Sequence, residues 1–154
     1  MPKAKPIPDG YHTVTPYLTV SGADKVMDFL KRAFDGKEVY ALRGPDGRIS
    51  HAEIQIGDSR VMLGEARGEW TPTVSTQYLY VQDADSLYRR ALEAGATSVQ
   101  EMKDQFYGDR SGGVKDPSGN MWWIATHIED VTPQEIDRRA AQMFAGQQTQ
   151  SAAS

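Results

Sequence analysis

Thr76-Gln-Tyr-Leu-Tyr-Val-Gln-Asp-Ala-Asp85 repeats an earlier stretch, Thr15-Pro-Tyr-Leu-Thr-Val-Ser-Gly-Ala-Asp24, at an offset of 61 residues. Six of the ten positions are identical. Each copy runs from β-branched and aromatic residues, which favour a strand, into the start of a helical pattern. A sequence that repeats in this way predicts two modules of the same architecture. We expect these modules to face each other, with a ligand in the space between them.

The composition bounds the class of protein. The chain has 154 residues, of which 39% are hydrophobic and 25% charged, as in an ordinary globular domain. The net charge of -4 gives no electrostatic basis for binding nucleic acid or an anionic membrane. Cysteine is absent, which excludes disulfides and thiolate metal sites and fits a reducing cytoplasm. With neither a membrane-spanning apolar run nor a signal peptide, we expect a cytoplasmic protein without nucleic acid or membrane partners.

Both halves of the chain read as a strand, a helix and three further strands, so the predicted fold class is α+β. Residues 1–10 form an extended lead-in, 11–65 the first β-α-β-β-β module, 66–74 a polar connector and 75–130 the second module. The first module is predicted to have strands at Thr13–Val20, Glu38–Leu42, Ile49–Ile56 and Arg60–Leu63 and a helix at Ala23–Phe34. The second is predicted to have strands at Gln77–Val81, Ser98–Met102, within 104–115 and at Met121–Thr126, and a helix at Ala84–Ala94.

A further helix follows the second module. Thr132 is a capping residue, Pro133 stands at the first helical position and Glu135 completes a capping box. These signals predict a C-terminal helix within 131–145. Residues 146–154 have nothing to bury and are predicted to form a disordered tail.

The two modules resemble one superfamily. The turn Asp116-Pro-Ser-Gly-Asn120 before the last strand, and Val81-Gln-Asp-Ala-Asp85 entering the second helix, are similar to stretches of the glyoxalase, bleomycin-resistance and extradiol-dioxygenase proteins, called vicinal oxygen chelate proteins. The resemblance covers residues 11–130. It implies two modules that pair around a concave cavity, and it implies a homodimer.

Three stretches are similar to one branch of that superfamily, which is named after a protein of the phosphonate operon. They are His51-Ala-Glu53, Tyr107-Gly-Asp-Arg110 and Ile124-Ala-Thr-His-Ile-Glu-Asp130. The superfamily contains isomerases, lyases, dioxygenases, epoxide-opening transferases and plain binding proteins. The resemblance therefore does not assign a reaction, and the sequence leaves open whether the protein is an enzyme.

The superfamily's metal positions carry unusual residues here. Members that use a metal place His, Gln or Glu at the start of each module's first strand and near the end of its last strand. The corresponding residues are Thr15, Met62, Thr76 and Trp123. None is a usual ligand for a catalytic divalent metal. We therefore predict a metal-free protein without a cofactor, which binds a small molecule.

Strand alternation assigns the residues that line the expected cavity. Leu18, Val20, Trp122 and Ile124 are predicted to face the helices. The predicted cavity side chains are Thr15, Tyr17, Thr19, His51, Glu53, Gln55, Arg60, Met62, Thr76, Tyr78, Tyr80, Met121, Trp123 and His127. Such an aromatic cavity suits a planar or amphipathic molecule, although the rings could also simply fill the inner face.

The predicted ligand-binding residues are Thr15, Tyr17, Met62, Thr76, Tyr78, Trp123 and Arg110. Arg110 could hold a carboxylate or a phosphate bidentately, or it could build a turn with Asp109. His51 and Glu53 share a strand face, either as ordinary solvated residues or as the only catalytic candidates. The alternative function is therefore a metal-dependent lyase, isomerase or dioxygenase in which these two residues hold a divalent metal. A third possibility is an interaction module that assembles through the helix Pro133–Phe144.

Overall fold

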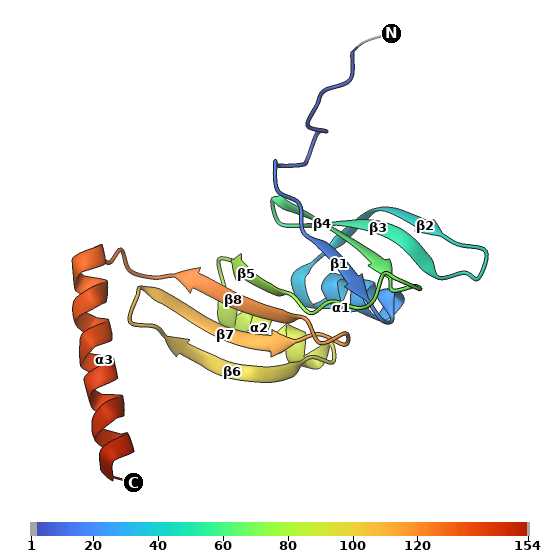
Figure 1. Cartoon of the computed structure of the whole chain (residues 1–154). Coiled ribbons are helices and arrows are strands. Elements are labelled where there is room, and N and C mark those ends of the chain that lie inside the picture. The colour runs from blue at the N-terminus through green and yellow to red at the C-terminus, as the bar shows by residue number, and fades with distance from the viewer. Residues whose placement is uncertain (1–2, 154) are drawn as a thin grey trace.

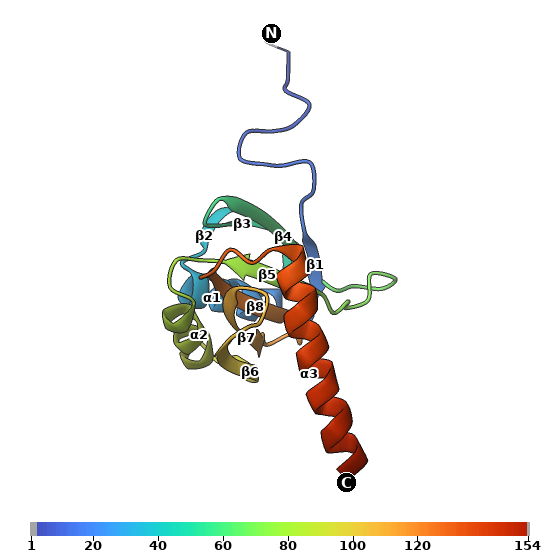
Figure 2. The ribbon, with the colours of Figure 1, turned by 90° about the vertical axis from the view of Figure 1, so that its left-hand side faces the viewer.

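The structure, a computed structural model, describes residues 3–153, with side chains up to residue 147. It contains two four-stranded sheets, three helices and an extended N-terminal arm that projects from the body (Figures 1 and 2). The first module comprises β1 (Tyr17–Val20), α1 (Ala23–Phe34), β2 (Lys37–Arg43), β3 (Ile49–Ile56) and β4 (Ser59–Glu65). The second comprises β5 (Thr76–Tyr80), α2 (Ala84–Glu93), β6 (Thr97–Asp104), β7 (Asp109–Lys115) and β8 (Met121–His127). These elements confirm the predicted α+β class.

The two sheets have the same topology. Their strand orders are β1-β4-β3-β2 and β5-β8-β7-β6, with the first and last strand of each module parallel. The register repeats as well: Tyr17 lies opposite Met62, and Tyr78 lies opposite Trp123, each 61 residues further on. The internal repeat of the sequence is thus a repeat of strand pairing.

The two helices also begin in the same way. Glu65, at the end of β4, accepts hydrogen bonds from the backbone N–H groups of Gly22 (3.0 Å) and Ala23 (2.7 Å). Thr126, which is 61 residues later near the end of β8, accepts one from Ala84 N–H (3.0 Å). The first N–H groups of a helix have no partner within the helix, so both modules use a side chain from the last strand to satisfy them.

One hydrophobic core runs through both modules. The predicted helix-facing residues Leu18, Val20, Trp122 and Ile124 are all buried. The helices α1 and α2 pack against each other, and the rings of Phe34 and Trp122 meet across the junction with their centroids 5.4 Å apart. The modules are therefore joined on their helix side.

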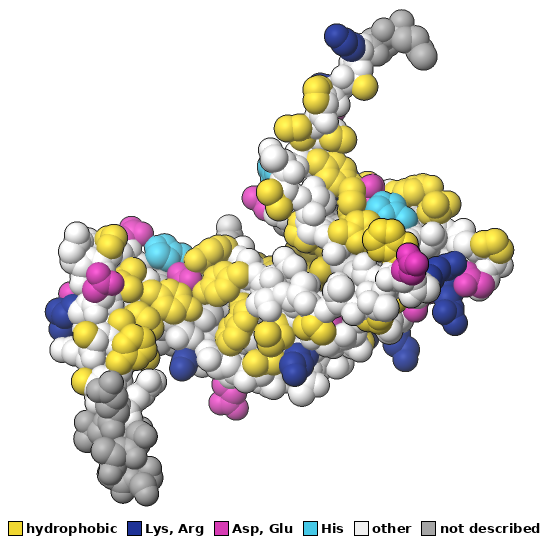
Figure 3. All heavy atoms as spheres, viewed as in Figure 1, with side chains coloured by type: hydrophobic (Ala, Val, Ile, Leu, Met, Phe, Trp, Pro, Cys, Tyr) yellow, Lys and Arg dark blue, Asp and Glu magenta, His cyan; other side chains and the backbone are white. Residues whose placement is uncertain are grey.

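The helix-free face of each sheet is open to solvent in the single chain. Yellow hydrophobic side chains lie uncovered over both sheets on the side shown in Figure 3. Tyr17 is 50% exposed on the first sheet, and Tyr80 is 65% exposed on the second. The cavity expected between the modules is thus not enclosed within one chain.

The third helix differs from the prediction. α3 (Pro133–Ala153) continues through most of the segment that the sequence predicted as a disordered tail, and Ser154 lies outside the described residues. Its predicted cap is present, because Thr132 Oγ1 accepts a hydrogen bond from Glu135 N–H (3.2 Å). Arg139 ties its first turns to the body through Glu129 (2.8 Å) and the carbonyl of Phe106 (3.0 Å). Among the described residues, no helix has both the length and the apolar character to cross a membrane.

The turn before β8 is built on one buried carboxylate. Asp116 is 5% exposed and accepts hydrogen bonds from the backbone N–H groups of Ser118 (2.8 Å) and Asn120 (3.0 Å) and from the indole N–H of Trp122 (2.9 Å). This carboxylate therefore fixes both the turn and the largest side chain of the module junction.

We predict that Asp116→Ala lowers the free energy of unfolding by about 2–4 kcal/mol, because it leaves the buried indole N–H of Trp122 and two turn amides without their charged acceptor. Urea unfolding at a fixed protein concentration measures the change. The matched control is Asp58→Ala in the exposed β3–β4 turn, which should change stability by no more than about 0.5 kcal/mol. Equal losses in the two variants would contradict the assigned role of Asp116.

Candidate functional site

The helix-free face of the first sheet, called face 1, carries aromatic, apolar and ionisable side chains. Its members are Tyr17, Tyr40, Leu42, His51, Glu53 and Met62. Tyr40 lies opposite Glu53 and Leu42 opposite His51 in the β2–β3 register, while Met62 lies opposite both Tyr17 and Glu53. Tyr17, Tyr40 and Leu42 are each about half exposed, at 50%, 51% and 49%. Face 1 is therefore a largely apolar surface around one imidazole and one carboxylate.

The polar groups of face 1 form a chain of contacts. The Tyr17 hydroxyl lies 3.2 Å from Nδ1 of His51, whose ring is stacked with that of Tyr17 at a centroid distance of 5.6 Å. Nε2 of His51 lies 3.4 Å from Oε1 of Glu53. The neighbouring Tyr11 hydroxyl, and then His51, lower the pKa of the Glu53 carboxyl. The structure thus brings His51 and Glu53 together as the sequence suggested and adds Tyr17 to them.

The helix-free face of the second sheet, called face 2, is organised around a buried carboxylate. Its members are Tyr78, Tyr80, Tyr107, Asp109, Trp123 and His127. Asp109 is only 2% exposed, and its Oδ2 accepts hydrogen bonds from the hydroxyls of Tyr78 (2.7 Å) and Tyr80 (2.9 Å). Its Oδ1 lies 2.8 Å from Nδ1 of His127, and Nε2 of His127 lies 2.8 Å from Asp130. Asp109 therefore fixes the positions of two tyrosines and one histidine.

The electrostatics follow from this arrangement. Burial opposes the ionisation of Asp109, but the hydrogen bonds from His127, Tyr78 and Tyr80 outweigh it and lower the pKa of this carboxyl. Asp109 and then Asp130 raise the pKa of His127. Burial, with Tyr107 and Asp109 nearby, raises the pKa of Tyr78. At neutral pH, face 2 thus presents protonated phenols around an ionised carboxylate.

Trp123 lies flat on the sheet because its neighbour is glycine. A Cβ atom on Gly113, which lies opposite Trp123 in the β7–β8 register, would come within 2.9 Å of the indole Cε3. A larger residue at position 113 would therefore push the ring off the sheet. The indole forms a platform beside Tyr78, and flat aromatic platforms favour the stacking of planar molecules.

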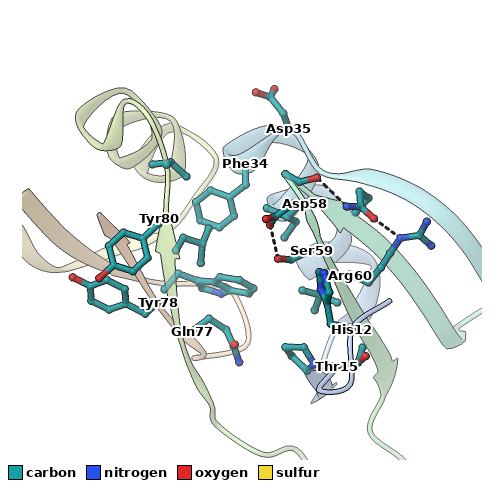
Figure 4. A pocket seen from close by; sticks show the side chains of 18 of the residues that line it. His12, Thr15, Phe34, Asp35, Asp58, Ser59, Arg60, Gln77, Tyr78 and Tyr80 are labelled. Atoms are coloured by element: carbon teal, nitrogen blue, oxygen red, sulfur yellow. Dashed lines mark hydrogen bonds between the residues drawn. The ribbon is translucent and has the colours of Figure 1, made fainter. Parts of the chain in front are cut away.

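A groove of about 940 Å³ separates the two modules. In Figure 4, Phe34 and Gln77 point into it between β5 and the β3–β4 turn, while Tyr78 and Tyr80 extend to the other side of β5. Its walls include Thr15 and Arg60. Tyr78 and Tyr80 also line it, so the groove adjoins face 2 and is separate from face 1.

The predicted ligand-binding residues are divided among these places. Tyr17 and Met62 lie on face 1, and Tyr78 and Trp123 on face 2. Thr15 lines the groove, which Tyr78 also borders. Thr76 begins β5 and is exposed. The single chain thus does not bring the seven predicted residues into one site.

Arg110 lies apart from both faces. Its guanidinium binds Asp85 in the first turn of α2 at 2.8 and 2.9 Å and Asp104 on β6 at 3.1 Å. It therefore ties the sheet to its helix, and the carboxylates that it binds are not that of Asp109, the turn partner predicted for it.

Sequence reasoning missed the role of Asp109, which was considered only as a partner of Arg110 in a turn. The alternation of β7 was the available signal, since it places Asp109 on the opposite face from Arg110. Gly108 before it has a φ of +104°, and a Cβ there would come within 2.2 Å of the Glu129 carbonyl. This glycine allows the chain to bend closely against the segment after β8, where Asp109 meets His127.

The metal chemistry of the superfamily resemblance does not fit the residues present. The four expected ligand positions carry two hydroxyls, a thioether and an indole, and that indole lies across Gly113. Among the described residues, no group of three or more His, Cys, Asp or Glu is arranged to hold a metal ion. His51 and Glu53, the alternative ligands, contact each other.

Comparisons with known proteins agree with the fold. Residues 11–124 match the family model described as Glyoxalase/Bleomycin resistance protein/Dioxygenase superfamily. An uncharacterised protein of Mycobacterium bovis is 37% identical over 134 residues, which cover 80% of this chain and 88% of that protein.

The solved structures that are similar to this chain include the following three. TioX from Micromonospora sp. ML1 is 26% identical, with a TM-score of 0.66 over 76% of this chain and 99% of that chain. A PhnB protein from Bacillus cereus, described as a putative 3-demethylubiquinone-9 3-methyltransferase, is 18% identical (TM-score 0.62; 75% and 99% covered). TnmS3 from Streptomyces sp. CB03234, described as an antibiotic binding protein, is 21% identical (TM-score 0.61; 75% and 95% covered).

The charge state of His127 predicts a pH dependence of stability. Folding raises the pKa of His127, so protonation of this residue stabilises the folded state. This contribution is fully present below the unfolded pKa of about 6.5. It is lost as the pH rises through the higher pKa of the folded state. We predict that His127→Gln lowers the free energy of unfolding more at pH 6 than at pH 9. Urea unfolding of both proteins at the two pH values measures this difference.

The control repeats the comparison in an Asp109→Asn background, which removes the main partner of His127. The pH dependence of the His127→Gln effect should then be smaller. An equal effect of His127→Gln at pH 6 and pH 9 in the otherwise unchanged chain would contradict the proposed linkage.

Proposed function

Because the chain belongs to the Glyoxalase/Bleomycin resistance protein/Dioxygenase superfamily, we propose that it binds a small planar or amphipathic molecule, without a metal, between aromatic faces of two copies of the chain. The observation that carries the proposal is the pair of open aromatic faces, each with an ordered polar group at its centre. Pockets for small molecules combine apolar walls with a few placed polar groups in this way.

The superfamily predicted from the sequence is confirmed. The similar solved structures include a PhnB protein, and the branch predicted from the sequence is named after a protein of that kind. The similarity to TnmS3 supports a binding role, since that protein is described as an antibiotic binding protein. The residues at the usual metal positions support binding without a metal. Metal-dependent chemistry through His51 and Glu53 remains the alternative.

Exposure of the two faces supports a homodimer. Aromatic side chains of monomeric proteins seldom remain open over contiguous surfaces of this kind, and such surfaces mark places where a partner or ligand sits. Both faces lie on one side of the molecule (Figure 3). A two-fold axis between the modules would place face 1 of one copy over face 2 of the other, so each site would combine the two faces.

The third possibility, assembly through α3, stays a prediction. Met143 and Phe144 are 41% and 57% exposed on this helix, which follows the segment matched to the superfamily. The open faces offer a larger aromatic surface for a second copy. We therefore place the ligand and the main dimer contact at faces 1 and 2.

The proposal predicts the composition of the purified protein. Native mass spectrometry together with elemental analysis should report a dimer without a stoichiometric divalent metal, and any co-purified molecule should be small and planar or amphipathic. A stoichiometric metal that is lost in His51→Ala would instead support the metal-dependent alternative. A monomer at micromolar concentration would contradict the composite site.

A second prediction tests which faces form one site. Tyr17→Ala changes face 1 and Trp123→Ala changes face 2. When the two variants are co-expressed with different tags and the mixed dimer is purified, one of its two sites should carry both changes and the other should be intact. This dimer should bind one equivalent of 2,7-dihydroxynaphthalene with the affinity of the unchanged protein, as measured by isothermal titration calorimetry.

The control places both substitutions in one protomer and leaves the other unchanged. Each site of that dimer then contains one altered face, so neither site should bind with full affinity. If each chain instead formed its own site, the control dimer would retain one intact site and the mixed dimer none. The two arrangements thus give opposite results.

A further inference from the structure

We propose that the two faces select planar molecules that carry hydrogen-bond donors, such as hydroxyl, amine or amide N–H groups, and disfavour molecules that present acceptors or carboxylates at the same places. This inference rests on the proposed binding function and names the class of ligand. It is carried by a feature that the two modules share. On each face, hydrogen-bonded tyrosine hydroxyls already direct their protons toward the protein: Tyr78 and Tyr80 toward the Asp109 carboxylate, and Tyr17 toward the His51 imidazole.

On face 2 the direction of the hydrogen bonds follows from the acceptor. An ionised carboxylate offers only lone pairs, so Tyr78 and Tyr80 must both donate to Oδ2 of Asp109, at 2.7 and 2.9 Å. A phenol has one proton, and in each of these tyrosines it is occupied by Asp109. The hydroxyl oxygens that remain for a ligand can therefore act only as acceptors.

The same two oxygens belong to accessible side chains. Tyr78 is 42% exposed and Tyr80 is 65% exposed, whereas Asp109 beneath them is buried. The Tyr107 hydroxyl lies 3.4 Å from that of Tyr78. Because the Tyr78 proton points to Asp109, Tyr107 must supply the donor in this contact. Tyr80 is therefore the more available acceptor of the pair.

On face 1 the same direction arises through a histidine. Glu53 can only accept, so the His51 proton that faces it lies on Nε2, at 3.4 Å from Oε1. In the neutral imidazole, Nδ1 then carries a lone pair, and the Tyr17 hydroxyl at 3.2 Å donates to it. Tyr17, which matches Tyr78 in the internal repeat, is thus left as an acceptor too.

These contacts disfavour anions and bare acceptors for two reasons. A ligand oxygen placed against Tyr17 or Tyr80 would meet a lone pair and lose its hydrogen bond to water without replacement, which is costly in a buried site. The nearby cations are also engaged: His127 lies between Asp109 and Asp130, and Arg60 donates to Gln55 and lies over the ring of Tyr11. A donor group meets the opposite situation, because a hydroxyl that already donates to a carboxylate is polarised into a better acceptor.

The test compares three planar probes of similar size on the full-length protein at pH 7. They are 2,7-dihydroxynaphthalene, 2,7-dimethoxynaphthalene and naphthalene-2,7-dicarboxylate. Isothermal titration calorimetry should show that the dihydroxy probe binds about tenfold more tightly than the dimethoxy probe, since one hydrogen bond is worth roughly that factor. The dicarboxylate should bind most weakly of the three.

Variants locate the preference. Tyr80→Phe and Tyr78→Phe keep the ring and remove the acceptor, so the dihydroxy probe should lose its advantage while the dimethoxy probe keeps its affinity. Asp109→Asn adds an amide donor, which can turn the tyrosine protons toward the ligand, and it should also reduce the preference. The control is Tyr88→Phe, a tyrosine on α2 whose hydroxyl contacts Ser98 and which lies on the helix side. This variant should keep the full preference.

The outcomes separate the two proposals. If the dimethoxy or dicarboxylate probe binds the unchanged protein as tightly as the dihydroxy probe, the donor preference is wrong while the binding function stands. The same conclusion follows if Tyr78→Phe and Tyr80→Phe both keep the preference. If none of the three probes binds, the proposed function fails and the donor preference fails with it. The tyrosine variants keep the test decisive even if Asp109→Asn does not fold.

Discussion

The contact between Phe34 and Trp122 joins the cores of the two modules, and the exposure of the two faces depends on it. Each sheet can bury one face against its own helix, as the alternation of its strands requires. Once the helices α1 and α2 pack together, both helix sides are buried in a common core. The remaining faces must then point away from that core. The same packing that stabilises the chain therefore leaves two aromatic surfaces available for a ligand and a second copy.

The sequence predicted the architecture well because the relevant signals are local. The 61-residue repeat and the strand alternation identified the modules and the helix-facing residues Leu18 and Trp122 correctly, and they placed Tyr17 and Tyr78 on the opposite, helix-free sides of the sheets. The placement of one module relative to the other depends on contacts between distant residues. No spacing along the chain reveals those contacts, so the expected single cavity became two open faces.

Polar contacts were harder to predict for a related reason. Asp109 lies in a segment that reads as a glycine-rich turn, and its function depends on tyrosines and a histidine from two other strands. Arg110, its neighbour, is charged and flexible enough to suggest ligand binding, yet it binds Asp85 on the helix side. One step along a strand reverses the face, so two adjacent residues acquire unrelated roles. Only the pairing partner across the sheet distinguishes them.

The internal repeat also explains why the two faces are not equivalent. In the strand registers, Met62 lies opposite Glu53, whereas its counterpart Trp123 lies opposite Gly113. The second module, which carries the indole of Trp123, thus has only a glycine at the position where the first module has the Glu53 carboxylate. The carboxylate of the second module, Asp109, lies nearer the start of β7, the strand that also contains Gly113. A site made from one face of each kind would offer a stacking platform on one side and an imidazole–carboxylate pair on the other. An unsymmetrical ligand would then bind in one orientation, although the protein around it is built from a duplicated unit.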